Sequence, residues 1–164
     1  MNLKEALAGE LSKDEIAILR RGFDIVGDIA IIEIPEGLAS KEMIIAQAIK
    51  RIHKNVNTVL RKMSERKGEF RLREFKMLIG NNTETTHKEY GMLLRLDVTK
   101  VYFSPRESEE RQRIAAMVRP GERIMVMFAG IGPYAIAIAK RQPEVDKIYA
   151  VEINPDAYKY MIEN

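Results

Sequence analysis

No cysteine occurs among the 164 residues, which excludes disulfide scaffolds, thiolate metal sites and cysteine nucleophiles. The two histidines, His53 and His87, lie far apart in the sequence, so we expect no histidine-based metal site. No apolar run approaches the ~20 residues that a membrane-spanning helix needs. The charged segment 1–15 also lacks the apolar core of a secretion signal. These absences predict a cytoplasmic protein that binds neither a metal nor a membrane.

Basic residues are abundant, but they are unevenly distributed. The chain is 46% hydrophobic and 31% charged, which is typical of one globular domain or two small ones. Segment 50–76 holds 10 basic and 3 acidic residues, a net charge of +7, whereas segment 1–49 has a net charge of −4. Such a basic segment indicates a surface that binds phosphate, as in nucleic-acid recognition. The alternative is a solvated face of a basic chain.

The first part of the chain has the pattern of an α+β domain. Ser12 and Glu15 form a capping box before one short helix. Ser40 is expected to cap a second helix, which carries apolar residues as far as Ile52. Turn residues and β-branched runs predict strands, with an antiparallel sheet, at 23–35 (turn at 27–28), 58–63, 69–79, 83–88 and 92–97. We predict that residues 1–104 form this α+β domain.

The pattern changes after Pro105. A charged helix is expected over 107–118, followed by a strand at 123–128, a helix at 134–141, a strand at 147–153 and a helix from Pro155. The continuous apolar strand 123–128 suits a parallel sheet covered on both faces. Residues 105–164 are therefore predicted to be the first βαβα part of a nucleotide-binding α/β domain. Because such domains have about five to seven strands, we expect the chain to be truncated or a fragment.

A glycine-rich turn follows the first of these strands and opens a helix. In this turn, 128–134, Gly130 and Gly132 let the backbone approach a ligand closely. Glu152 ends the next strand, where a carboxylate can accept hydrogen bonds from the ribose hydroxyls of a nucleoside cofactor. Pro133 removes one N–H from the helix start, which weakens a pyrophosphate cradle and favours S-adenosylmethionine over NAD. The simpler interpretation is a tight turn beside a surface carboxylate.

Five stretches carry a resemblance to a known family: FDIVGDIAII, VLRKMSERKGEFRLREF, THKEYGMLLRLDVTKVYFSPRESEERQRI, MFAGIGPYAIAIA and VEINPDAY. From about Leu19 to Asn164 the chain resembles the archaeal and eukaryotic tRNA (guanine-37, N1)-methyltransferases of the Met-10 type. The resemblance implies a tRNA-contacting domain followed by a Rossmann-like methyltransferase domain. It also implies methyl transfer from S-adenosylmethionine to N1 of guanine 37 in the anticodon loop. Some archaeal relatives also methylate C7 of a wyosine precursor.

The resemblance further implies roles for individual residues. Arg71 would be catalytic, because it could stabilise negative charge on guanine O6 as N1 loses its proton; by residue type alone it is an ordinary phosphate contact. Tyr102 would lie near cofactor and base, or else pack in the core. The expected cofactor-binding residues are Tyr102, Phe128, Gly130, Gly132, Glu152 and Asn154. The expected tRNA-binding residues are Arg61, Lys62, Arg66, Lys67, Arg73, Arg106 and Arg111.

Two departures from the family pattern limit these expectations. Val126 stands where family members often carry an aspartate that helps hold the methionine end of the cofactor. The family's catalytic aspartate is expected beyond Asn164, so we expect this chain to lack the general base and to be inactive as given. Two other functions stay open: aminocarboxypropyl transfer from the same cofactor in wyosine synthesis, and a non-catalytic tRNA-binding module. The sequence does not fix an oligomeric state.

Overall fold

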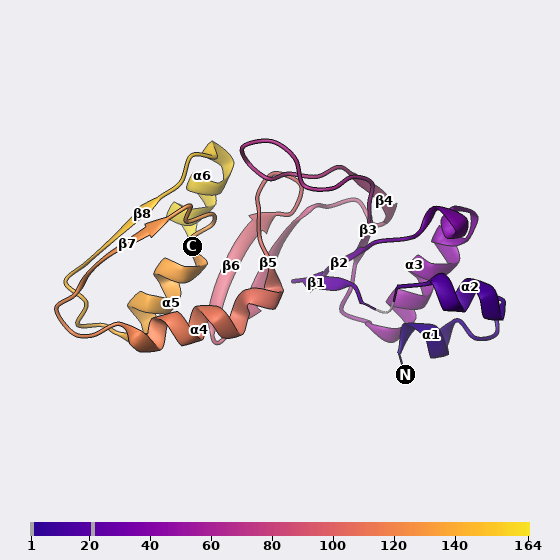
Figure 1. The fold of residues 1–164 in the computed structure, drawn as a ribbon, viewed down its shortest axis with the longest axis horizontal. Coiled ribbons are helices and arrows are strands. Elements are labelled where there is room, and N and C mark those ends of the chain that lie inside the picture. The colour runs from indigo at the N-terminus through magenta and orange to yellow at the C-terminus, as the bar shows by residue number, and fades with distance from the viewer. Residues whose placement is uncertain (1, 21) are drawn as a thin grey trace. The chain divides into compact units, whose positions relative to one another are not determined.

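The computed structural model describes residues 2–20 and 22–164, which form a mixed α/β structure of two compact units (Figure 1). Unit 1 comprises Met1–Arg66 and Arg73–Thr83, and unit 2 comprises Lys67–Leu72 and Glu84–Asn164. This division differs from the expected boundary between residues 104 and 105. The hairpin at 84–97 belongs to unit 2, because helices of that unit pack against it. No helix in the described ranges is long and apolar enough to cross a membrane.

Unit 1 is built on a four-stranded sheet of order β1-β2-β3-β4. Its strands are β1 (Asp24–Val26), β2 (Ile29–Ile32), β3 (Thr58–Lys62) and β4 (Phe75–Ile79). The antiparallel sheet expected here is wrong for one pair, since β2 and β3 run parallel. Helix α3 (Glu42–Ile52) carries the chain back between them, as a parallel connection requires. The sheet is therefore mixed.

The helices of unit 1 cover an apolar core. Short helices α1 (Leu3–Ala6) and α2 (Lys13–Ile18) each begin with a capping box, at Asn2 and at the predicted Ser12. The expected cap at Ser40 is wrong, because the 3₁₀ turn η1 (Glu36–Lys41) runs through that residue and α3 follows it directly. Fully buried side chains from these helices and the sheet include Leu7, Ala30, Ile32, Leu38, Ile45, Ile49 and Val59.

The strand expected over 69–79 begins later than predicted. Only β4 is extended, because Gly68 and Arg71 both adopt positive φ, at 71° and 52°. The chain between them folds into a tight loop closed by a bridge from Lys67 to Leu72. This loop is assigned to unit 2, whereas β4 pairs with β3 in unit 1.

Unit 2 combines a hairpin with two strand–helix pairs. The hairpin of β5 (Glu84–Glu89) and β6 (Met92–Asp97) turns at Tyr90 and Gly91, both at positive φ as a two-residue primed turn requires. The 3₁₀ turn η2 (Pro105–Glu107) and α4 (Ser108–Met117) follow. The predicted strand–helix order then appears as β7 (Arg123–Met127), α5 (Pro133–Arg141), β8 (Lys147–Val151) and α6 (Pro155–Glu163), with β7 and β8 parallel.

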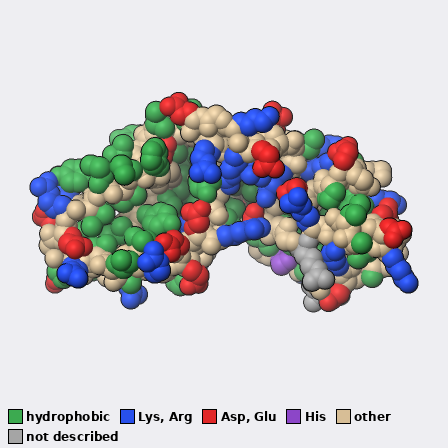
Figure 2. All heavy atoms as spheres, viewed as in Figure 1, with side chains coloured by type: hydrophobic (Ala, Val, Ile, Leu, Met, Phe, Trp, Pro, Cys, Tyr) green, Lys and Arg blue, Asp and Glu red, His purple; other side chains and the backbone are tan. Residues whose placement is uncertain are grey.

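The β7–β8 pair is not covered on both faces by the described residues, contrary to expectation. Alternate side chains of both strands are exposed, among them Met125, Met127 and Val151 at 63%, 67% and 54%. Figure 2 shows apolar side chains gathered on the surface over this part of unit 2. The other face carries half-buried residues such as Ile124 and Ile148.

Candidate functional site

The carboxyl ends of β7 and β8 place the glycine turn and the acidic residue side by side. Met127 pairs with Val151 in the parallel register, and the amide of Ala129 donates to the carbonyl oxygen of Val151 at 2.9 Å. The next residues of the two strands, Phe128 and Glu152, therefore leave the sheet at the same edge. Ligands of open α/β sheets bind at this edge.

Two glycines shape the turn in different ways. Gly130 has φ 57° and lies against the pocket described below. Gly132 has φ 90° and is the N-cap of α5, and a Cβ there would stand 3.0 Å from Cγ of Met161. The backbone conformation at Gly132 therefore favours glycine, and a side chain there would press on Met161 of α6. Phe128 also has a positive φ of 56°, and its side chain is 87% exposed.

The Glu152 carboxylate fixes both sides of this edge. Its Oε2 accepts a hydrogen bond from the Gly130 amide at 2.7 Å, and its Oε1 accepts one from the Asn154 amide at 2.8 Å. An ionised carboxylate has about four lone-pair sites, so it can accept further donors from a ligand. Glu152 thus holds the glycine turn and still presents acceptor capacity.

Asn154 is a buried polar residue with a structural role that the sequence only partly indicated. Its Oδ1 accepts from the amides of Asp156 and Ala157 and so caps α6, while its Nδ2 donates to the carbonyl oxygen of Lys100 at 2.8 Å. The side chain therefore ties the start of α6 to the segment that leads to Tyr102. Only 4% of the residue is exposed.

Arg71 and Tyr102 come together although 31 positions separate them. The Arg71 guanidinium carbon lies 5.1 Å from the centroid of the Tyr102 ring, within the range of a cation–π contact. The Tyr102 hydroxyl donates to Oε1 of Glu107 at 2.8 Å. This contact places the exposed Arg71 guanidinium at the ring, on the loop 67–72 of the same unit.

These groups surround a pocket of about 410 Å³ in unit 2. Of the predicted residues, all but Gly132 of the cofactor set line it, together with Arg71. The sequence analysis missed four lining residues, for which adjacency to predicted ones was the only signal: Glu69, Phe70, Ile153 and Ala157. The volume suits a nucleoside-sized ligand. The pocket offers a carboxylate, a guanidinium, backbone polar groups and aromatic rings.

Among the predicted tRNA contacts, Arg61 needs correction. Its side chain is 8% exposed and forms ion pairs in unit 1 with Glu36 at 3.1 Å and Glu42 at 2.9 Å. The side chain also donates to the carbonyl oxygen of Ile34. Arg61 is therefore a buried structural cation, because its position on β3 turns it toward acidic side chains rather than solvent.

Arg111 needs the same correction in unit 2. It is 1% exposed, and its guanidinium donates through two nitrogens to both oxygens of Glu89 at 2.6 Å. It also donates to the carbonyl oxygen of Ser104 at 3.1 Å and lies over the Phe103 ring. One signal was present in the sequence: Arg111 lies at helical spacing from Ile114 and Ala115, on the apolar face of α4.

A histidine lies beside this ion pair. His87 Nε2 is 3.6 Å from Oε2 of Glu89, and its ring packs against Phe103. Burial lowers the pKa of His87 below its usual value, although the Glu89 carboxylate opposes this effect. The ring is a packing residue in this structure.

The other predicted tRNA contacts differ in exposure. Lys62 is half-buried and pairs with Asp24 at 3.3 Å in unit 1. Arg66 and Arg73 are half-buried, whereas Lys67 and Arg106 are exposed. Within the part of the chain that the structure describes, no group of three or more histidine, aspartate or glutamate residues could hold a metal ion.

Comparison with known protein families gives two matches that meet near residue 84. Residues 3–83 match a model described as the TYW2 N-terminal domain, and residues 85–164 match one described as the TRM5/TYW2 methyltransferase domain. The division between these models falls where the structure passes from unit 1 to the hairpin of unit 2.

Individual relatives agree with these matches. The chain is 49% identical over 147 residues to tRNA (guanine(37)-N(1))-methyltransferase Trm5b of Pyrococcus abyssi, covering 89% of this chain and 44% of that protein. It is 40% identical over 140 residues to tRNA(Phe) (4-demethylwyosine(37)-C(7)) aminocarboxypropyltransferase of Methanocaldococcus jannaschii, covering 85% and 53%. A solved complex of aTrm5 with tRNALeu superposes with a TM-score of 0.88 at 36% identity, over 100% of this chain and 49% of that one. The chain spans about half the length of the curated relatives it matches.

Proposed function

The chain belongs to the TRM5/TYW2 family, and from that premise we propose that it serves methyl transfer from S-adenosylmethionine to N1 of guanine 37 in tRNA. The observation that carries the proposal is the pocket in unit 2, where Glu152, Gly130 and Phe128 meet Arg71 and Tyr102. A cofactor side and a base side are thereby present in one cavity.

The cofactor side suits a nucleoside without a pyrophosphate. The remaining lone pairs of Glu152 can accept hydrogen bonds from ribose hydroxyls, and the exposed ring of Phe128 offers a face for the adenine. Pro133 occupies the first turn of α5 and removes a donor that a pyrophosphate would use. When bound, S-adenosylmethionine supplies an electrophilic methyl group on a sulfonium.

The base side is formed by Arg71 and Tyr102. The guanidinium can donate hydrogen bonds to guanine O6, on which negative charge develops as a general base takes the N1 proton. The Tyr102 ring lies beneath the guanidinium at 5.1 Å and limits its freedom, so the charge is positioned before the base arrives. In this proposal Arg71 is a catalytic residue, while Tyr102 positions it and contacts the base or the cofactor.

The tRNA would meet basic groups near this pocket. With Arg61 and Arg111 buried, the exposed Lys67 and Arg106 are the strongest candidates for phosphate contacts in unit 2. Arg66 and Arg73 add partly exposed positive charge. We propose the anticodon loop around position 37 as the region bound, which the names of the curated relatives support.

Calorimetric titration with S-adenosylmethionine, S-adenosylhomocysteine and NAD tests the cofactor first. We expect binding of the two sulfur nucleosides and none of NAD. Phe128→Ala should weaken binding by about tenfold, since stacking on an aromatic ring is worth roughly 1–3 kcal/mol per base. Glu144→Gln, a change at an exposed residue outside the pocket lining, is the control. Absence of binding by the wild type would overturn the proposal.

Aminocarboxypropyl transfer is the second candidate, because a relative at 40% identity carries that activity in its name. The two reactions leave different by-products from one cofactor. Methyl transfer leaves S-adenosylhomocysteine, whereas aminocarboxypropyl transfer leaves 5′-methylthioadenosine. Chromatography after incubation with tRNA that carries guanine or 4-demethylwyosine at position 37 separates them. Methylthioadenosine as the product would favour the second candidate.

A further inference from the structure

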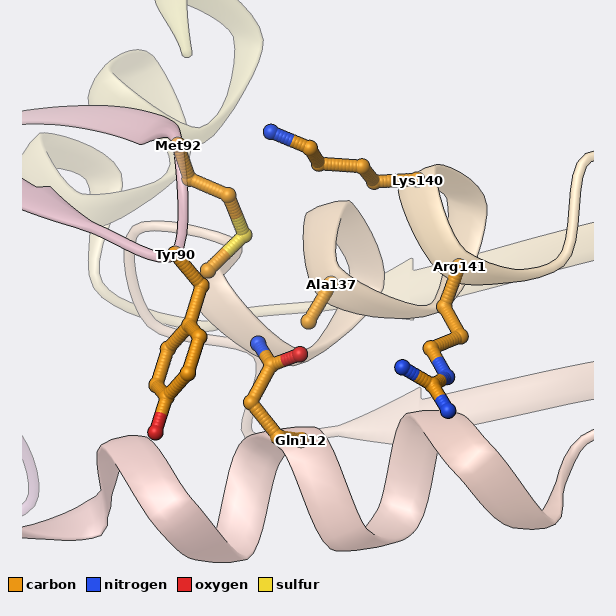
Figure 3. A pocket seen from close by; sticks show the side chains of 6 residues that line it. All are labelled: Tyr90, Met92, Gln112, Ala137, Lys140 and Arg141. Atoms are coloured by element: carbon orange, nitrogen blue, oxygen red, sulfur yellow. The ribbon is translucent and has the colours of Figure 1, made fainter.

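A second pocket lies at the end of α5 opposite to the glycine turn. It has a volume of about 610 Å³ and is lined by Tyr90 and Met92 of the hairpin, Gln112 of α4, and Ala137, Lys140 and Arg141 of α5 (Figure 3). Three elements of unit 2 therefore build its walls. It shares no lining residue with the pocket described above.

Two cations at this pocket have no counter-charge. Neither Lys140 nor Arg141 has a hydrogen-bond or ion-pair partner within residues 2–20 and 22–164. Figure 3 shows Lys140 reaching from α5 toward Met92, and Arg141 and Gln112 occupying the space between α4 and α5. The last turn of a helix favours cations in general. That preference does not explain why both cations line the same cavity.

The acidic groups of the neighbouring helix are already engaged elsewhere. Glu109 accepts a hydrogen bond from the Tyr90 hydroxyl, and Glu110 forms a two-point contact with Arg113 at 2.7 Å. These two glutamates therefore do not neutralise the positive charge of Lys140 and Arg141 at the pocket. Gln112 adds an amide that can donate to the same ligand.

The hairpin turn leaves room for one of these cations. A Cβ built on Gly91 would stand 2.6 Å from Nζ of Lys140, so the ammonium group lies against the hairpin turn. Gly91 also has φ 74°, which the primed turn requires. The ammonium therefore lies beside the hairpin turn at the edge of the pocket.

We propose that this second pocket binds a phosphate group, held by Arg141 and Gln112 in the space between α4 and α5, with the ammonium of Lys140 on the hairpin side of the same pocket. Cations with unfilled hydrogen-bonding capacity in a concave site match the charge and the acceptors of phosphate oxygens. The nine residues of α5 span roughly 13 Å at 1.5 Å per residue, so this phosphate lies about that far from the glycine turn. A tRNA phosphodiester is one source and a free phosphate compound is the other. The tRNA source rests on the proposed function.

The test compares K140Q/R141Q with wild type and with R119Q/K159Q, a control that removes two exposed cations from the same unit. The affinity for a tRNA transcript is measured between 50 and 300 mM salt. Loss of this phosphate contact should weaken binding by about tenfold at 0.1 M salt and reduce the salt slope by roughly 0.7–0.9. Inorganic phosphate, compared with chloride at equal ionic strength, forms the second arm, with the melting temperature as the readout.

The arms identify the source and can refute the site. A changed salt slope in K140Q/R141Q but not in R119Q/K159Q assigns the site to tRNA phosphate. Phosphate-dependent stabilisation that K140Q/R141Q alone loses, with unchanged tRNA affinity, assigns it to a free phosphate compound. If neither arm separates the two variants, the proposal is wrong.

Two further measurements keep these outcomes clear. In the wild-type protein, the bound tRNA transcript or inorganic phosphate should protect Lys140 from acetylation more than it protects Lys159. This measurement does not depend on the folding of any variant. Binding of S-adenosylhomocysteine to the first pocket is measured in parallel. If the wild-type protein does not bind S-adenosylhomocysteine, the proposed function is wrong. If it binds S-adenosylhomocysteine but Lys140 is not protected, only the phosphate site is wrong.

Discussion

Removing Arg111 should destabilise unit 2 far more than removing Arg113, which lies on the same helix and also pairs with a glutamate. Arg111 and Arg113 each make a two-point contact with a glutamate, Glu89 and Glu110. The first pair is buried, with side chains 1% and 5% exposed, and the second is exposed, at 59% and 47%. The chain thus contains its own matched control.

Burial sets the expected magnitudes. Arg111→Met leaves the Glu89 carboxylate buried with no guanidinium, and breaking a buried pair in this way costs about 3–5 kcal/mol. Glu89→Leu should cost a similar amount, because the Arg111 guanidinium loses its two-point carboxylate partner. The Ser104 carbonyl oxygen, Glu107 at 3.8 Å and the Phe103 ring do not replace it. The double variant removes both charges and should recover most of the loss. Arg113→Met should have little effect, because water and salt screen its pair.

Urea unfolding followed by circular dichroism measures these differences, and hydrogen exchange of the β5 and α4 amides reports on unit 2 alone. A double-mutant cycle on Arg111 and Glu89 should give a coupling of at least about 3 kcal/mol. Equal effects of Arg111→Met and Arg113→Met would refute the reasoning from burial. In that case, a reduced salt dependence of tRNA binding by Arg111→Met would support the tRNA contact that the sequence analysis expected for Arg111.

Three further predictions concern single positions. Gly132→Ala should lose about 1–3 kcal/mol in a thermal melt, because a side chain there is strained at φ 90° and meets Met161. Asn154→Ala should lose about 2 kcal/mol in urea unfolding, since it removes the cap of α6 and leaves the Lys100 carbonyl oxygen without its donor. Stability should rise with pH through the window just below pH 6.5, because the folded-state pKa of His87 is lowered and the unfolded chain binds the proton first. His87→Gln should flatten that rise, and an unchanged profile would contradict it.

Local patterns in the sequence were sufficient for much of unit 2. The order of strand, glycine turn, helix, strand and helix after residue 120 is confirmed, because each element carries its own signals of apolar runs, glycines and caps. Pro155 and Asn154 begin α6 as expected. The parallel pairing of β2 and β3 in unit 1 was missed, because β-branched runs predict strands and not their partners.

The roles of the arginines could not be predicted from charge. Arg61 and Arg111 were grouped with exposed tRNA contacts, yet each is buried against acidic residues brought from other elements. Glu89 lies 22 positions before Arg111, so the partner is visible only once β5 and α4 are packed together. Burial of a cation follows from tertiary pairing, which a single sequence records weakly.

Backbone strain explains why the position of Arg71 was also beyond local prediction. The segment was expected to be a strand, and an extended Arg71 would have remained in the sheet of unit 1. In the structure, φ of 52° at Arg71 and 56° at Phe128 are two of the three positive values found at non-glycine residues in the described ranges. Both residues line the same pocket. The strands predicted at these positions would have given each residue an extended backbone without strain. Strain of about 1–3 kcal/mol persists only where surrounding structure enforces it, and such positions concentrate at functional sites. The coincidence therefore supports the pocket as the site of chemistry on grounds independent of the family.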